Sequence, residues 1–314
     1  MERKRKQIKK ASIGLLSLFF LLLLSTEGLQ QKRPEVPYVP TPEKVILEML
    51  KIADVGKDDV LYDLGCGDGR IIITAAKELG CRGVGIDIDP VRIQESRENA
   101  INAGVSNKVN FFLMDLFEAD ITQATVVTLY LLSDVNIRLR PKLLRELEPG
   151  TRVVSHDFDM KTWKPDESVV INDNYNDYPP VYDNFWFENY WDKHNVYLWI
   201  IPANVTGAWK WTMPAISGKK RYTLELDQTF QEVKGKAFED SLSIPLHIKD
   251  DKIKGNRLEV TLERKLKGHT EHIHLEGIVK DHTMKGLVRV EGKPDVKEKW
   301  LAKRVPSTIR AINK

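Results

Sequence analysis

A glycine-rich loop is the stretch of the sequence best suited to hold a small molecule. It reads Gly65-Cys66-Gly67-Asp68-Gly69 and lies between an apolar segment, Val60 to Leu64, and a predicted helix that starts at about Arg70. Glycines let backbone N–H groups approach a ligand closely, and a helix start offers such groups unpaired. The G-x-G-x-G spacing differs from the G-x-G-x-x-G of dinucleotide-binding loops, and Asp63 precedes it. Carboxylates here would repel a pyrophosphate and attract a cationic ligand.

Further acids follow predicted strands and complete a candidate pocket. Asp87 ends the second strand, 20 positions after Gly67, where a carboxylate can accept hydrogen bonds from ribose hydroxyls. Asp115 and Leu116 follow the third strand, in position for an adenine amino group and an apolar wall. The combination predicts a pocket for S-adenosyl-L-methionine; the alternative is a structural glycine turn with solvated acids. Replacing Asp87 by Ala is expected to weaken cofactor binding by about 1–3 kcal/mol and to leave the unfolding of the free protein nearly unchanged.

The segments around the loop alternate between strand and helix patterns. Thr41-Pro42-Glu43 is typical of a helix start, with an N-cap residue, a proline in the first turn and an acid after it. Strands are predicted at 60–64, 84–87, 109–113, 126–131, 153–155 and 195–201, and helices from about 41, 70, 89 and 137. Apolar runs bounded by helices predict an α/β fold, a Rossmann-like sheet with helices on both faces.

From Gly207 onward the apolar period changes to two. Apolar and polar residues alternate in several short segments: Trp209/Trp211, Tyr222/Leu224/Leu226, Leu258/Val260/Leu262 and Ile273/Leu275. This pattern predicts antiparallel strands with one wet face, and closure into a β-barrel would remove their exposed edges. We therefore predict three parts: residues 1–30 as a targeting segment, 31–205 as the α/β domain and 206–314 as the barrel.

Charge is distributed unevenly along the 314 residues. Residues 34–205 hold 17 Lys and Arg against 28 Asp and Glu, whereas residues 206–314 hold 23 against 15. A uniformly basic nucleic-acid-binding protein would not have this distribution. The acidic central part either steers a cationic substrate or is a solvated acidic face.

The N-terminal segment has the pattern of an export signal. Six Lys and Arg lie within Met1 to Lys10, and an apolar run follows from Ile13 to Leu24. This run is shorter than the roughly 20 apolar residues of a membrane-spanning helix. We expect a signal peptide, with an uncleaved membrane anchor as the alternative. Either places the protein in the cell envelope, exported or membrane-anchored; anchoring on the cytoplasmic face of the membrane is the remaining possibility.

The sequence resembles class I, seven-stranded S-adenosylmethionine-dependent methyltransferases. Within this class it is most similar to the broad-specificity archaeal protein-lysine methyltransferases and their mitochondrial relatives. Four segments carry the resemblance: Tyr38–Lys44, Leu61–Ile72, Thr125–Leu132 and Arg152–Phe158. The resemblance implies a cofactor site that comprises Asp63, Gly65, Gly67 and Gly69 at the methionine part, Asp87 at the ribose, Asp115 at the adenine, Tyr38 and Thr41 over the methionine end, and also Cys66, Arg70, Ile88 and Leu116.

The same resemblance implies methyl transfer to a nitrogen, with accessible lysines of proteins as the acceptors. A lysine amine has a pKa of about 10.4 and must lose a proton before it attacks a methyl group. We expect Tyr130, Asp134 and Asn136 to position this amine. The Asn-Pro-Pro-Tyr motif of enzymes that methylate nucleic-acid amino groups is absent after the fourth strand, so no nucleic-acid partner is expected. A small-molecule or lipid methyltransferase and a non-catalytic envelope binding protein are the alternatives.

Other constellations give weaker signals. The aromatic-rich stretch Tyr175 to Trp199 is either packing at a sheet edge or a lid over the substrate. His156 and Asp157 follow the fifth strand, as a structural pair or as substrate contacts. His269, His272 and His274 form an H-x-x-H-x-H pattern that no cysteine or nearby acid completes to a convincing zinc set, and no metal site is expected. The C-terminal half resembles small lipocalin-like barrels; it could bind an apolar ligand, dock an acidic envelope partner or stabilise the enzyme.

Overall fold

The computed structural model describes residues 33–172, 193–215, 218–240, 246–266 and 268–312. Contacts divide the chain into a segment Met1–Glu35 and a unit Val36–Lys314, and the elements below belong to the second. Within the described ranges, no helix is long and apolar enough to cross a membrane. The predicted signal or anchor, and residues 173–192 of the predicted lid, lie outside these ranges.

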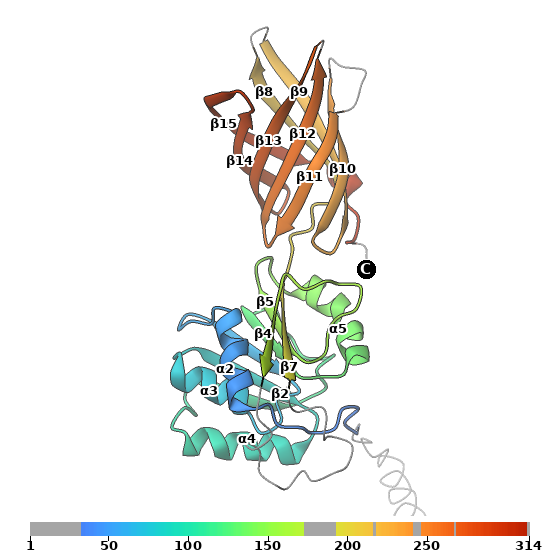
Figure 1. The fold of residues 1–314 in the computed structure, drawn as a ribbon. Coiled ribbons are helices and arrows are strands. Elements are labelled where there is room, and N and C mark those ends of the chain that lie inside the picture. Colours follow the sequence, from blue (N-terminus) through green and yellow to red (C-terminus); the bar gives the residue numbers. More distant parts are fainter. Residues whose placement is uncertain (1–32, 173–192, 216–217, 241–245, 267, 313–314) are drawn as a thin grey trace, which may run out of the picture. The chain divides into compact units, whose positions relative to one another are not determined.

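A seven-stranded sheet forms the first half of this unit (Figure 1). Its spatial order is β3-β2-β1-β4-β5-β7-β6, parallel from β3 to β5, while β7 runs antiparallel to both of its neighbours. The strands are β1 (Val60–Leu64), β2 (Arg82–Asp87), β3 (Val109–Leu113), β4 (Val126–Leu129), β5 (Arg152–His156), β6 (Glu167–Asn172) and β7 (Lys193–Ile200). The chain order reverses between β1 and β4, which is where open α/β sheets bind ligands.

Helices cover both faces of the sheet, as the sequence predicts. They are α2 (Glu43–Ile52), α3 (Arg70–Glu78), α4 (Pro90–Asn102) and α5 (Ser133–Glu146). Successive residues of a strand point to opposite faces, so Leu61 packs in the core that α2, α3 and α4 share, while Tyr62 packs in the core that contains α5. The predicted Rossmann-like architecture is confirmed.

Three elements differ from the prediction. Helix α2 begins at Glu43 with Pro42, not Thr41, at its N-cap position, and no side chain caps it. Helix α5 begins at Ser133 rather than near residue 137 and runs through Pro141, a residue that usually ends a helix. Pro141 has no N–H to donate to the carbonyl of Ile137. This carbonyl instead accepts a hydrogen bond from Nε of Arg140 at 3.4 Å. The strand β6 was not predicted, because its edge position leaves most of its side chains partly or fully exposed and gives it no continuous apolar run.

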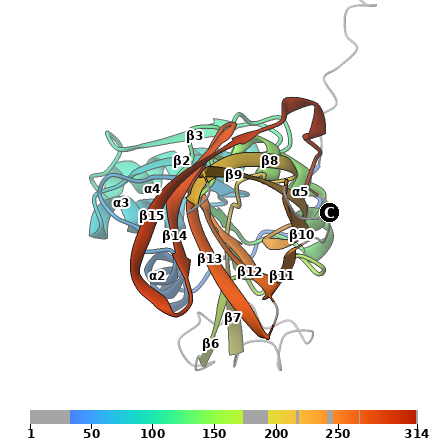
Figure 2. The same cartoon turned by 90° about the horizontal axis from the view of Figure 1, so that it is seen from above.

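Eight antiparallel strands of the C-terminal half close into a barrel, as Figure 2 shows from the end of the ring. The strands are β8 (Gly207–Ala215), β9 (Gly218–Thr229), β10 (Glu232–Glu239), β11 (Leu246–Lys254), β12 (Arg257–Leu266), β13 (His269–Lys280), β14 (Thr283–Val290) and β15 (Lys293–Arg304), followed by a short 3-10 helix, η3 (Pro306–Thr308). The alternating apolar residues form its core. The Arg304 guanidinium lies 5.2 Å from the centre of the Trp209 ring and donates to the Thr206 carbonyl.

Candidate functional site

The glycine loop between β1 and α3 turns sharply, and its geometry requires glycine. Gly65, Gly67 and Gly69 have φ angles of 88°, 52° and 79°, in the left-handed region that other residues rarely adopt. A Cβ atom on Gly67 would lie only 2.6 Å from a ring carbon of Tyr38. The N–H groups of Gly65 and Cys66 both donate to the Ile86 carbonyl, at 2.8 and 3.0 Å, which fixes the loop to the end of β2.

Asp63 is the most buried acid beneath this loop, with 2% of its surface exposed. Its Oδ1 accepts a hydrogen bond from the Thr128 hydroxyl at 2.8 Å. Burial raises the pKa of Asp63 from 3.8 to about 7, and the carboxylates of Asp87 and Asp68 add to this shift. A ligand ammonium group next to Asp63 would favour the ionised form again. The sequence does not indicate this role of Thr128, because a threonine inside an apolar strand has no functional pattern around it.

Asp87 connects the end of β2 to the glycine loop. Its Oδ2 accepts from the N–H of Gly67 at 2.8 Å, and its Oδ1 accepts from the N–H of Asp89 at 2.9 Å. A carboxylate oxygen has more than one lone pair, so both atoms can still accept from ribose hydroxyls. The carboxylate therefore also holds the loop in the free protein, a role that the sequence prediction left out.

Tyr38 covers the outer side of the glycine loop. Its ring lies against Gly67, and the Arg92 guanidinium stacks 4.3 Å from its centre. Burial, with the nearby Asp68 carboxylate, raises the pKa of Tyr38 to about 12, so the phenol keeps its proton. Arg70 forms a two-pronged ion pair with Asp68, with Nε and NH2 contacts of 3.0 and 2.8 Å.

Arg70 also ties the segment before α2 to the loop. Its NH1 donates to the carbonyl of Thr41 at 3.1 Å, and Thr41 itself is 3% exposed. Arg70 is thus engaged within the protein, with Asp68 and with the Thr41 backbone. Arg70 therefore holds the segment before α2 against the glycine loop.

The remaining predicted cofactor residues surround the ends of β2 and β3. Ile88 and Leu116 are half-buried, and Asp115 accepts from the N–H of Phe117 at 2.9 Å. Cys66 is 4% exposed, and burial raises the pKa of its thiol well above the ordinary value. Its Sγ packs toward the core, since a Cβ on the neighbouring Gly85 would lie 2.9 Å from it. Cys66 would therefore contribute its backbone rather than its thiol.

The three residues that were predicted to position the acceptor amine lie in different environments. Tyr130 follows β4 and is half-buried, with its ring centre 3.9 Å from that of His156. Asp134 is exposed in the first turn of α5. Asn136 is fully buried and donates to the Ser155 hydroxyl and the Phe158 carbonyl, at 3.1 and 2.9 Å. Asn136 is therefore bound to the loop after β5 and away from solvent, whereas Tyr130 and Asp134 keep exposed surface.

Together these residues fit S-adenosylmethionine. The cofactor carries an ammonium group and a sulfonium centre, and three acids gather at the loop: Asp63, Asp68 and Asp87. Side chains on Gly65 and Gly67 would collide with Leu131 and Tyr38, so the loop can pack this closely only with glycine at these positions. The parallel sheet, its chain reversal beside β1 and this acidic glycine pocket define a class I S-adenosylmethionine-dependent methyltransferase.

Comparisons with known proteins identify the family. A family model described as the ANTKMT methyltransferase domain matches residues 63–167. The protein-lysine N-methyltransferase of Saccharolobus islandicus is 53% identical over 141 residues, which cover 45% of this chain and 88% of that protein. The chain belongs to this protein-lysine N-methyltransferase family.

Other relatives match over different shares of their length. The adenine nucleotide translocase lysine N-methyltransferase of Mus musculus is 34% identical over 134 residues, which cover 42% of this chain and 58% of that protein. A solved structure described as an RNA methyltransferase from Salinibacter ruber with S-adenosyl-L-homocysteine is 52% identical, covers 53% of this chain and 96% of that chain, and has a TM-score of 0.46.

Proposed function

We propose that this protein transfers the methyl group of S-adenosylmethionine to the side-chain amine of lysines in proteins. The observation that carries the proposal is the 53% identity to the archaeal protein-lysine N-methyltransferase over 88% of that enzyme's length. The region matched by the family model includes the pocket residues from Asp63 to the end of β5, while Tyr38 and Thr41 precede it.

The residues of the pocket have distinct tasks in this reaction. When bound, S-adenosylmethionine supplies a methyl group on a positively charged sulfur. Asp63 would hold the ammonium group of the cofactor, Asp87 would accept from its ribose, and Tyr38 would cover its methionine end. Rate enhancement would come mainly from holding the amine in line with the methyl group, because proximity and orientation alone can supply several kcal/mol.

The acceptor amine must be neutral when it attacks. A lysine in water is almost fully protonated at neutral pH, and transfer into a partly apolar pocket lowers its pKa. Tyr130 would line the acceptor side of this pocket, where its ring packs on His156. No separate base is required if desolvation and the nearby sulfonium release the proton to water.

The test is to follow a labelled methyl group. The full chain is incubated with methyl-labelled S-adenosylmethionine and a cell extract, and the products are separated into protein, RNA, lipid and small molecules. Methyl-lysine in protein hydrolysates, absent with the Asp63→Asn variant, supports the proposal. RNA is the rival acceptor that such an extract also contains. Label that enters only nuclease-sensitive material would overturn lysine as the acceptor.

We also propose that the protein works at the cell envelope, attached to a membrane through its N-terminus. The basic segment Met1 to Lys10 and the apolar run Ile13 to Leu24 support this proposal. The basic barrel, with 23 Lys and Arg against 15 Asp and Glu, would face an acidic envelope partner. Cell fractionation tests this location. Recovery of the full chain in the high-speed supernatant, equal to that of a chain without residues 1–30, would contradict it.

A further inference from the structure

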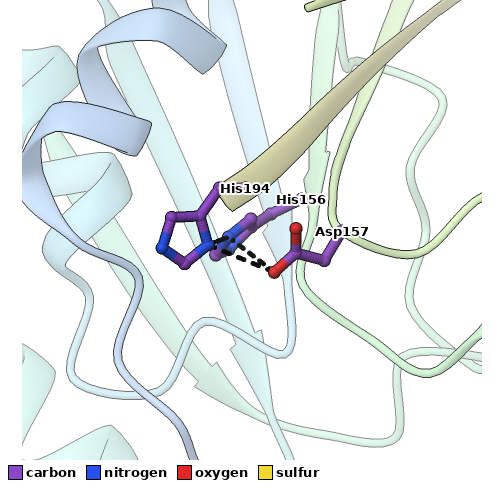
Figure 3. A group of neighbouring side chains, drawn as sticks. All are labelled: His156, Asp157 and His194. Carbon is purple, nitrogen blue, oxygen red and sulfur yellow. Dashed lines mark hydrogen bonds and ion pairs between the residues drawn. The ribbon is translucent and has the colours of Figure 1, made fainter. Parts of the chain in front are cut away.

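A compact group of nitrogen and oxygen donors lies outside the cofactor loop, where β5 ends and β7 begins. Figure 3 shows its members, His156, Asp157 and His194, with their ligating atoms directed at one another. Nε2 of His156 lies 2.9 Å from Nδ1 of His194, and Oδ2 of Asp157 lies 3.1 and 3.2 Å from these two nitrogens. The exposed fractions of the three side chains are 0%, 9% and 1%, so water hardly reaches them.

The backbone aims the Asp157 carboxylate into this group. Asp157 has a φ angle of 56°, in the left-handed region that is costly for a residue with a side chain. The turn is held because the N–H of Asp157 donates to the Asn195 carbonyl at 2.7 Å, and its Oδ1 accepts from the Asn195 N–H at 2.8 Å. Oδ2 is thereby directed at both imidazole rings.

Hydrogen bonds alone do not satisfy this triangle. A neutral imidazole has one N–H, so each ring nitrogen presents either a proton or a lone pair, and the ionised carboxylate presents lone pairs. The three atoms are Nε2 of His156, Nδ1 of His194 and Oδ2 of Asp157, and each presents either a proton or a lone pair. At least two of them must therefore present the same kind of group to each other. Polar atoms that are buried without a complete set of hydrogen bonds lower the stability of the folded protein.

A single cation removes the conflict, because all three lone pairs can point at it. An ion about 2.1 Å from each atom would sit roughly 1.1 Å outside their plane, a normal distance for zinc with imidazole and carboxylate ligands. The observed separations of 2.9, 3.1 and 3.2 Å lie closer to the edge of an octahedral face at that distance, about 3.0 Å, than to the edge of a tetrahedral site, about 3.4 Å. Two histidines and one carboxylate with open positions on the other side form a known metal-binding set.

We propose that His156, Asp157 and His194 bind one divalent transition-metal ion, for which zinc and cobalt(II) serve as probes. The ion would join the end of β5 to the start of β7. It would lie beside the Tyr130 ring, which packs on His156 at 3.9 Å between centres. No metal site is expected from the sequence. His194 is 37 positions away from Asp157 in the sequence, so their proximity is visible only in the structure. This site does not depend on which acceptor the enzyme methylates.

The first measurement is the metal content of the full chain. The protein is prepared without an affinity tag of histidines, in buffers free of chelators, and its zinc content is determined by mass spectrometry. Cobalt(II) is then added to the metal-free protein, and its visible absorption spectrum reports nitrogen and oxygen ligands. We expect about one equivalent of zinc per chain, cobalt bands that saturate at one equivalent, and a lower Tm after chelation.

Variants then assign the site. Asp157→Asn removes the carboxylate but keeps a residue that tolerates the left-handed turn, and His194→Gln removes a ring at the edge of the group. Both should bind zinc at least tenfold more weakly. His282→Ala, at an exposed histidine of the barrel, is the matched control and should bind as the parent protein does.

Two outcomes would overturn the proposal. The first is a parent protein that takes up less than a tenth of an equivalent of zinc or cobalt and shows no change in Tm when either is added; this would mean that the group is held by hydrogen bonds. The second is metal that persists in Asp157→Asn and is lost in His272→Ala. That result would place the metal on the barrel, where His272 lies between Glu263 and Glu291.

Discussion

Replacing Asp63 by Asn should stabilise the free protein at pH 8 while it weakens cofactor binding. The buried carboxylate has a pKa of about 7, against 3.8 for an ordinary aspartate. A group whose pKa is raised on folding favours the folded state only when protonated, so its cost grows as the pH rises from about 4 to about 7. An Asn of the same shape can still accept the hydrogen bond from Thr128 and carries no charge.

The magnitude follows from the shift in pKa. At 1.36 kcal/mol for each pKa unit, the raised pKa costs the folded protein about 4 kcal/mol at pH 8, where the carboxylate is ionised, and about 2 kcal/mol at pH 5, where the folded protein must take up a proton. The new amide group brings its own cost of about 1–3 kcal/mol if its N–H groups lack acceptors. That second cost does not depend on pH, so the stability difference between Asp63→Asn and the parent should rise by about 2–3 kcal/mol from pH 5 to pH 8.

Urea unfolding of both cofactor-free proteins, at half-unit steps from pH 5 to pH 8, measures this difference. Asp68→Asn is the control from the same loop. Burial works to raise the pKa of Asp68, but the hydrogen bond and ion pair with Arg70 lower it overall. Asp68 is therefore ionised in both the folded and the unfolded state over this range, and its variant should differ from the parent by a constant amount. If the stability difference between Asp63→Asn and the parent is also independent of pH, the assignment of Asp63 as a buried acid with a raised pKa is refuted.

Three further predictions concern the same pocket. Asp87→Ala should weaken S-adenosylmethionine binding tenfold or more in calorimetry and, contrary to the expectation from sequence, lower the unfolding free energy of the free protein by about 1–3 kcal/mol, because the Gly67 N–H loses its acceptor. Gly67→Ala should abolish measurable binding of S-adenosylmethionine, since the new Cβ would displace Tyr38 and a φ of 52° disfavours alanine. Retained binding would mean that the glycine loop does not hold the cofactor. Cofactor affinity should rise about eightfold from pH 6 to pH 7.5 as Asp63 loses its proton, and this rise should be absent in Asp63→Asn.

The sequence by itself determined the architecture and the cofactor loop. Periodicity separates the α/β half from the barrel near Gly207, because apolar spacing follows directly from helix and strand geometry. The glycine spacing and Asp63 indicate the cofactor because both act within a few consecutive residues, where the chain itself fixes the geometry.

Only the tertiary structure decided which distant side chains meet. Thr128 reaches Asp63 because β4 lies beside β1 in the sheet, and a threonine in an apolar strand carries no sign of this. Asn136 turns inward because α5 begins at Ser133, four residues earlier than the pattern around Pro141 indicates. His194 joins Asp157 because β7 pairs antiparallel with β5. Such contacts depend on strand order and register, which are set by the packing of the whole sheet and not by local sequence.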